Sequence, residues 1–211
     1  MKLSDIYNRL KSRIPMPEGK YKSYAILIPL IYVNGNIHLL FEIRSKSLKT
    51  QPGEICFPGG KIEENESPLE SAIRETCEEL NIKESNIEII GQTDYIVTPF
   101  NLILYPFVGS IKDIDSKNIN FNRDEVESIF TVPLDFFIHN TPETYFVNSK
   151  LEIPDNFPFE KIENGKVYNF RTGKYPIYFY EYDDYIIWGM TARITNNLIY
   201  ILSKNNRPIS K

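Results

Sequence analysis

The sequence predicts an α/β fold, a three-layer α/β/α sandwich built on a mixed β-sheet. Segments rich in Ile, Val, Tyr and Phe are interleaved along the chain with segments whose apolar residues recur at the helical period. Strands that alternate with helices in this way are typical of a sheet covered on both faces. The 211 residues, 42% of them hydrophobic, are enough for one large domain or two small ones.

The first elements are a helix and a hairpin. Residues 4–13 predict a short amphipathic helix that is expected to cover the sheet or a neighbouring element. Residues 24–33 and 37–44 predict two strands of a β-hairpin, because Asn34-Gly35 supplies the positive φ angles of a tight turn. Residues 54–57 predict a short strand that leads into a glycine loop.

A capped helix follows this loop. Ser67 is the predicted N-cap, Pro68 the first helical residue, and Glu70 completes a capping box. Asn81 can adopt the left-handed conformation that ends many helices, so the helix is expected over residues 68–80.

The second half of the chain is more varied. Residues 87–97 and 102–111 read as β-rich runs, whereas residues 122–130 are typical of either a loop or a short helix. A further short element is expected to begin in residues 133–137. Residues 139–173 carry three prolines among polar residues and are expected to form a long excursion outside the core.

The chain is expected to end in a hairpin and a helix. Residues 175–182 and 185–188 flank Asp183-Asp184 and predict the hairpin, in which alternating tyrosines serve sheet packing rather than base stacking. The final helix is expected over residues 190–203. Its inward residues are predicted to be Ile194, Leu198 and Ile201.

The helix at residues 68–80 carries the chemistry. Glu75, Glu78 and Glu79 stand at i, i+3 and i+4, so their carboxylates share one face. A solvated acidic face is the plain interpretation, yet like charges at this spacing destabilise a helix and favour a bound cation. Oxygen ligands without His or Cys suit Mg²⁺ or Mn²⁺, ions that commonly bridge carboxylates to phosphates. A phosphate-containing substrate is therefore expected.

These residues resemble the Nudix box. Gly60, Glu66, Arg74-Glu75 and Glu78-Glu79 match its spacing, while Thr76 and Asn81 stand where the pattern has an aliphatic residue and a glycine. The resemblance implies the Nudix form of the sandwich. It implies that the metal ligands are Glu75, Glu78, Glu79 and Gly60. Arg74 is expected to hold the ligands in place. The general base is expected to be Glu75, with Glu125 and Glu127 as later alternatives; the other role open to one of these two is to complete the metal shell.

A narrower resemblance is to the coenzyme A pyrophosphatases of that family. It rests on residues 39–45, on Leu48-Lys49, on Gly53 and on residues 57–60. Residues 106–109, 125–134 and 187–193 are also similar to segments of that subfamily. It implies hydrolysis of coenzyme A or its derivatives to 3',5'-ADP and 4'-phosphopantetheine, with Arg44, Ser45 and Lys49 binding substrate phosphate. Departures such as Lys49, where that signature has Arg, keep open a Nudix hydrolase of ADP-ribose, dinucleotides or nucleoside triphosphates. A non-catalytic nucleotide sensor is the remaining alternative.

The matched segments favour a single domain over residues 1–211, with residues 139–173 as an insertion. A net charge of −4 argues against a nucleic-acid partner and leaves a small molecule as the expected one. Because neither a signal peptide nor an apolar span is visible, we expect a cytoplasmic protein without membrane contact. Cys56 and Cys77 have no metal-type spacing and are expected to stay reduced. A homodimer is left open.

Overall fold

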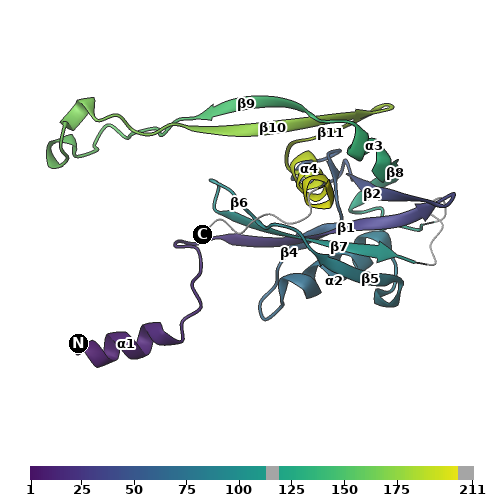
Figure 1. Ribbon diagram of the computed structural model, residues 1–211, viewed down its shortest axis with the longest axis horizontal. Coiled ribbons are helices and arrows are strands. Elements are labelled where there is room, and N and C mark those ends of the chain that lie inside the picture. The colour runs from purple at the N-terminus through teal and green to yellow at the C-terminus, as the bar shows by residue number, and fades with distance from the viewer. Residues whose placement is uncertain (113–118, 204–211) are drawn as a thin grey trace.

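The computed structural model describes residues 1–112 and 119–203, and it is built on an eight-stranded mixed sheet with helices on both faces (Figure 1). The strands are β1 (Lys22–Val33), β2 (Asn36–Arg44), β3 (Ile55–Cys56), β4 (Gly59–Lys61), β5 (Ile87–Gln92), β6 (Ile96–Val97), β7 (Leu102–Ile111) and β8 (Val126–Pro133). The main path runs β3-β2-β1-β7-β5, with β8 beside β2, β4 beside β1 and β6 beside β7. Only the pair β1 and β7 is parallel among these described pairings, which makes the sheet mixed.

A second sheet and the helices complete the fold. Three antiparallel strands form the small sheet in the order β11-β10-β9: β9 (Glu143–Ser149), β10 (Gly173–Tyr182) and β11 (Tyr185–Trp188). The helices are α1 (Leu3–Lys11), α2 (Pro68–Leu80), α3 (Leu134–His139) and α4 (Gly189–Ser203), with short 3-10 turns at Glu84–Asn86, Phe159–Lys161 and Gly165–Val167. Helix α2 covers one face of the large sheet, while α4 and the small sheet cover the other (Figure 1).

Strand β1 explains how the two faces are filled. Its side chains alternate, so Ala25 and Leu27 pack with Ala72 of α2, while Ile26 and Ile28 pack in the cluster that includes Leu198 of α4. A strand buried on both faces needs a continuous apolar run, which is what the sequence has here. The three-layer α/β/α expectation is confirmed.

Most predicted elements are present. The β1–β2 turn holds Asn34 at φ 51° and Gly35 at φ 85°, as the tight hairpin requires. The final hairpin forms around Asp183, and its tyrosines pack: Tyr180 is buried and Tyr185 stacks on Phe130 with ring centroids 3.7 Å apart.

Two expectations for these elements were wrong, and one strand was not predicted. Residues 122–130 were expected to form a loop or a short helix, but strand β8 begins at Val126. This strand pairs with β2, and Val126, Phe130 and Val132 are buried on one of its faces. The excursion at residues 139–173 contains strand β9, which the sequence did not predict. Ile201 in the last turn of α4 is exposed, whereas Ile194 and Leu198 are buried as expected.

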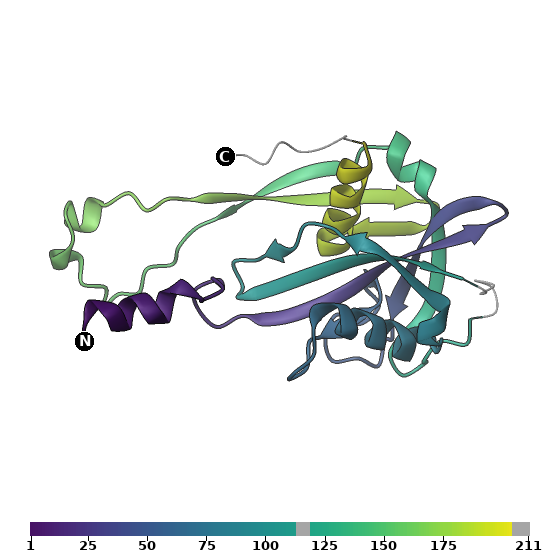
Figure 2. The ribbon, with the colours of Figure 1, turned by 60° about the horizontal axis from the view of Figure 1, so that its bottom comes forward.

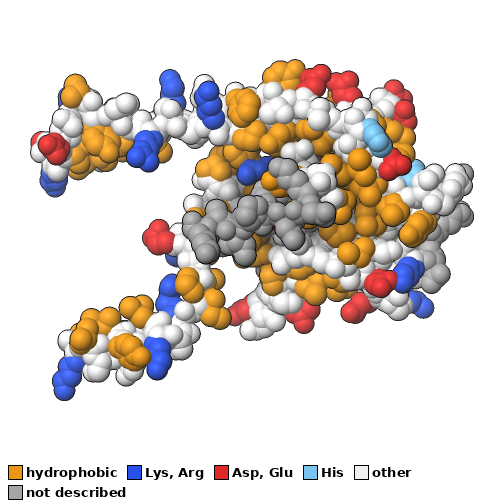
Figure 3. Space-filling view, in the orientation of Figure 1, with side chains coloured by type: hydrophobic (Ala, Val, Ile, Leu, Met, Phe, Trp, Pro, Cys, Tyr) orange, Lys and Arg blue, Asp and Glu red, His pale blue; other side chains and the backbone are white. Residues whose placement is uncertain are grey.

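Two parts of the chain extend away from the body. We call the ribbon of β9 and β10, with the connecting residues 150–172, the arm. The arm and α1 project beyond the large sheet (Figures 1 and 2). Helix α1 has no buried residue, so it does not cover the sheet or a neighbouring element as expected. Figure 3 shows hydrophobic side chains on its surface. Within the described residues, no helix combines the length and apolarity needed to cross a membrane.

Candidate metal and active site

The site begins with the caps that fix helix α2. Ser67 Oγ accepts a hydrogen bond from Glu70 N at 3.3 Å, and Glu70 Oε2 accepts one from Ser67 N at 2.8 Å, which completes the predicted capping box. At the other end Asn81 has φ 52° and its N–H donates to the Cys77 carbonyl oxygen. The helix therefore begins and ends as the sequence predicted.

Two adjacent glycines let the carboxylates of α2 approach the sheet. Glu79 Oε2 accepts a hydrogen bond from Gly59 N at 2.7 Å. A Cβ on Gly59 would overlap the Ala25 carbonyl oxygen, and a Cβ on Gly60 would overlap the Glu75 carboxylate. Gly59 thus requires glycine, because a Cβ there would meet the main chain of β1, whereas Gly60 leaves the space that the Glu75 carboxylate occupies.

A third carboxylate reaches the same place from the loop before β8. One oxygen each of Glu75, Glu79 and Glu125 lies within 4.8 Å of the others. Two main-chain hydrogen bonds place Glu125: Ser45 N donates to its carbonyl oxygen, and Asn122 N donates to the carbonyl oxygen of Glu79, each at 2.8 Å. The loop before β8 is therefore tied to both β2 and α2.

Arg74 organises the outer side of this group. Its Nε and Nη2 bind the two carboxylate oxygens of Glu66 at 2.8 and 3.1 Å, and Nη1 binds Glu75 Oε1 at 2.9 Å. The bidentate bond to Arg74 lowers the pKa of Glu66 to about 2. Nη1 also contacts Glu78 Oε2 at 3.3 Å. Arg74 thus holds the Glu75 carboxylate from outside the group of three.

A fourth carboxylate lies beneath the group. Glu42 is 1% exposed, and its Oε1 has no hydrogen-bond partner among the described residues. It shares a face of β2 with Leu40, which packs on Leu80 of α2, so the strand period places Glu42 under the same helix. Burial, followed by the charge of Glu79, raises its pKa well above the usual range. Sequence reasoning missed this residue, although a Glu within the apolar run of β2 was a visible signal.

The electrostatics of the site fit a divalent cation. Burial raises the pKa of Glu79 to about 8, with smaller contributions from the charges of Glu75 and Glu125. Burial likewise raises the pKa of Glu75 against the opposing effect of Arg74. Carboxylates crowded in this way disfavour their charged forms until a cation joins them. The donors are all oxygen, and Glu42 supplies a buried oxygen without a partner, so the residues present suit a hard ion such as Mg²⁺ or Mn²⁺.

The structure separates the other predicted residues. Glu78 is exposed, contacts Arg74 and lies outside the group of three. Glu127 is exposed on β8 and also lies outside the group, whereas Glu125 belongs to it. Arg44 ends β2 next to the loop before β8, and Ser45 follows it. Arg44 is half-buried, and the hydroxyls of Ser45 and Ser47 are hydrogen-bonded at 2.9 Å. Lys49 is exposed in the loop that follows.

Comparison with known proteins places the chain in a family. Residues 24–150 match the NUDIX domain. "Nudix hydrolase 3" of Caenorhabditis elegans is 33% identical over 154 residues, 71% of this chain and 63% of that protein. "Peroxisomal coenzyme A diphosphatase NUDT7" of Mus musculus is 34% identical over 128 residues, 58% of this chain and 51% of that protein. The chain thus spans less than two thirds of either relative.

Other similarities cover more of the chain. "Uncharacterized Nudix hydrolase NudL" of Photorhabdus laumondii is 28% identical over 201 residues, 93% of this chain and 95% of that protein. The crystal structure of a MutT/nudix family protein from Enterococcus faecalis superposes with a TM-score of 0.52 at 14% identity, covering 97% of this chain and 71% of that one. That likeness supports the fold assignment.

Proposed function

Because the chain belongs to the Nudix hydrolase family, we propose that it hydrolyses the diphosphate of coenzyme A, or of a coenzyme A derivative, to 3',5'-ADP and 4'-phosphopantetheine, with Mg²⁺ or Mn²⁺ as cofactor. The observation that carries this proposal is the convergence of Glu75, Glu79 and Glu125 on one point beside Gly60. Support for coenzyme A comes from the similarity to two proteins named as peroxisomal coenzyme A diphosphatases, that of the mouse and ndx-8 of C. elegans.

Each acidic residue has a distinct part in the proposal. Glu75, Glu79 and Glu125 would hold the cation. Glu42 lies beneath these three residues, and Glu78 lies on α2 outside their group. When bound, the cation neutralises diphosphate oxygens and lowers the pKa of the attacking water. Glu75 is the proposed general base: Arg74 occupies its Oε1, which leaves Oε2 to accept the proton of the water. Arg74 keeps that carboxylate oriented through its second anchor on Glu66.

A basic rim beside the acidic group favours a substrate with several phosphates. The loop that carries Lys46 and Lys49 is held against the loop that carries Arg123, because Ser45 N donates to the Glu125 carbonyl oxygen and Ser47 Oγ to that of Asp124 at 3.5 Å. Cations at this rim would attract a polyanion toward the acidic centre. Coenzyme A has a 3'-phosphate in addition to its diphosphate, so it offers a group for this rim.

A substrate panel tests the proposal. With Mg²⁺ or Mn²⁺ added, coenzyme A, 3'-dephospho-coenzyme A, ADP-ribose, a diadenosine polyphosphate and nucleoside triphosphates are incubated with the protein, and products are identified by mass spectrometry. We expect 3',5'-ADP and 4'-phosphopantetheine from coenzyme A. Intact coenzyme A together with cleaved ADP-ribose would contradict the substrate assignment. No turnover of any compound by metal-loaded protein would instead favour a nucleotide sensor.

Variants of the acidic group make the test residue-specific. Glu79→Gln keeps the size of the side chain and removes its charge, so Mn²⁺ binding measured by calorimetry should weaken and turnover should fall by orders of magnitude. Glu127→Gln is the matched control, because that carboxylate is exposed and lies outside the group. If the two variants bind Mn²⁺ equally well, the assigned site is wrong.

A further inference from the structure

Strand β9 leaves one edge of the small sheet open. The order β11-β10-β9 gives β9 a partner on one side only among the described residues, so its outward N–H and C=O groups face solvent. All seven of its residues are exposed. Tyr145, Phe146 and Val147 at its centre are 59%, 64% and 50% exposed, so the edge is apolar as well as unpaired.

This edge lacks the features that usually protect an exposed strand. Native edges are blunted by lysine, proline, a bulge or a covering element. The sequence of β9, ETYFVNS, has neither lysine nor proline, and its seven-residue pairing with β10 runs without a register shift. A two-stranded ribbon on its own is marginal in water. Strand β9 therefore has the composition of a strand that is covered by another strand.

We propose that β9 pairs with β9 of a second copy of this chain, antiparallel and about a twofold axis at Phe146. The two small sheets would then join into one continuous six-stranded sheet, in the order β11-β10-β9 and its symmetric repeat. Such an interface is isologous, because the same surface of both copies is used. Phe146 lies opposite itself, and Tyr145 of each copy lies opposite Val147 of the other.

Charge favours this orientation. Glu143 stands at the start of β9, and Lys150 follows its last residue, so the edge is acidic at one end and basic at the other. Antiparallel pairing about Phe146 places Glu143 opposite Ser149 of the second copy, next to its Lys150. Parallel pairing would instead align Glu143 with Glu143 and Lys150 with Lys150, and like charges across a strand pair are destabilising. The sequence of the edge is thus complementary to itself in one orientation.

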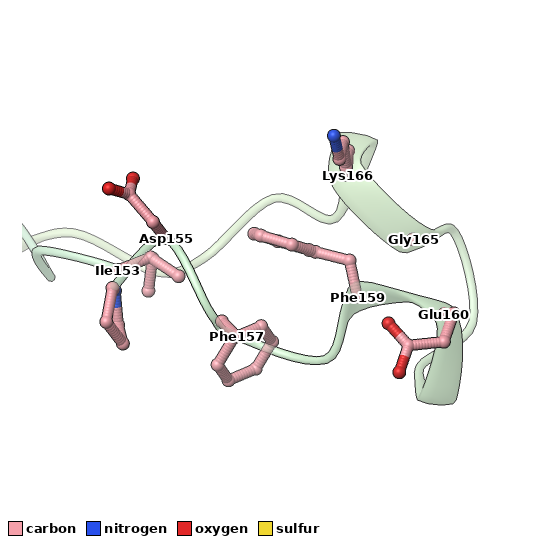
Figure 4. Close-up of a pocket in the computed structure, with 8 residues that line it drawn as sticks. Ile153, Asp155, Phe157, Phe159, Glu160, Gly165 and Lys166 are labelled. Atoms are coloured by element: carbon pink, nitrogen blue, oxygen red, sulfur yellow. The ribbon is translucent and has the colours of Figure 1, made fainter.

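Other exposed apolar surfaces do not identify their occupant. Helix α1 exposes Leu3, Tyr7 and Leu10, and the tip of the arm has a hollow lined in part by Phe157 and Phe159 (Figure 4). Neither presents a row of unpaired main-chain groups that would fix the register of a partner. They enter the test as competing interfaces.

The oligomeric state in solution tests the pairing. Size-exclusion chromatography with light scattering, over a series of protein concentrations, should show a dimer for the unmodified chain. Phe146→Lys and Phe146→Glu each place like charges face to face on the axis, so each variant alone should be monomeric. An equimolar mixture of the two should form dimers again, because the axis then joins Lys to Glu. Since Phe146 is exposed, both variants should keep the far-ultraviolet circular dichroism of the parent.

Two controls separate this edge from other surfaces. Ile186→Lys changes an exposed residue on β11, at the opposite edge of the same sheet, and should leave the dimer intact. Leu10→Lys changes the apolar surface of α1 and should also leave it intact. A monomeric parent chain, a dimer that survives Phe146→Lys, or a dimer lost through Leu10→Lys instead would each overturn the proposal. None of these residues touches the acidic group, so the outcome is independent of the proposed function.

Discussion

At the scale of single residues, the space left by Gly60 determines where the Glu75 carboxylate lies. Gly60→Ala would place a methyl group in the volume of that carboxylate, and the flexible side chain would have to move away. The main-chain conformation at Gly60 does not require glycine, so the fold should survive. We expect Mn²⁺ affinity to fall by roughly tenfold to a hundredfold, the usual cost of disturbing what positions a ligand.

Calorimetric titration with Mn²⁺ measures this effect, and Gly91→Ala is its control. A Cβ at Gly91 meets no atom within 4 Å, so this substitution should change neither the affinity nor the thermal midpoint. Equal affinities of Gly60→Ala and the parent chain would show that Glu75 does not depend on the space at Gly60.

The residues of the site differ in how far the sequence could predict them. Glu75 and Glu79 were found because helical spacing alone places them on one face, and Gly60 and Arg74 because they match the spacing of the Nudix box. Glu125 was only one of two alternatives, because its position depends on hydrogen bonds from Ser45 and Asn122 that no local pattern encodes.

At the scale of elements, helix α2 ends at Asn81, whose main chain adopts the left-handed conformation. A residue with a Cβ is disfavoured at φ 52°, and asparagine tolerates this conformation better than most. Asn81→Ala should therefore lower the free energy of unfolding by about 1 kcal/mol. Asn81→Gly should keep or raise it, because glycine adopts this conformation without strain. Urea unfolding of the three proteins gives the comparison, and a fully stable Asn81→Ala would show that the cap contributes little.

Elements with local signals were predicted better than those that depend on distant partners. Helix α2 and the β1–β2 hairpin carry their caps and turn residues in the sequence, so both were found. Strand β8 was missed because the polar residues around its start, Glu125 before it and Glu127 within it, resemble a loop until pairing with β2 buries the alternate residues. Strand β9 was missed for a related reason: all of its residues are exposed, so it has no inward apolar face to reveal it.

At the scale of the whole molecule, the large sheet, the small sheet and α4 share one hydrophobic core. One cluster of buried residues joins Ile26 and Phe41 of the large sheet to Tyr180 of the small sheet and to Leu198 of α4. Removing any of these elements would expose the apolar surface of the others. We therefore propose that the two sheets and α4 unfold together as the single domain expected from the sequence.

Trp188 makes this prediction measurable, because it is the only tryptophan of the chain and lies on β11, stacked on Phe179 of β10. Its fluorescence reports on the small sheet, whereas far-ultraviolet circular dichroism reports on all elements. Urea transitions followed by the two signals should have the same midpoint and slope, since the core of the small sheet is also the core of the large one. The comparison should be made with Phe146→Lys, so that dissociation does not add a transition of its own. An earlier midpoint for the fluorescence would mean that the small sheet unfolds separately, and the chain would then contain two cooperative units.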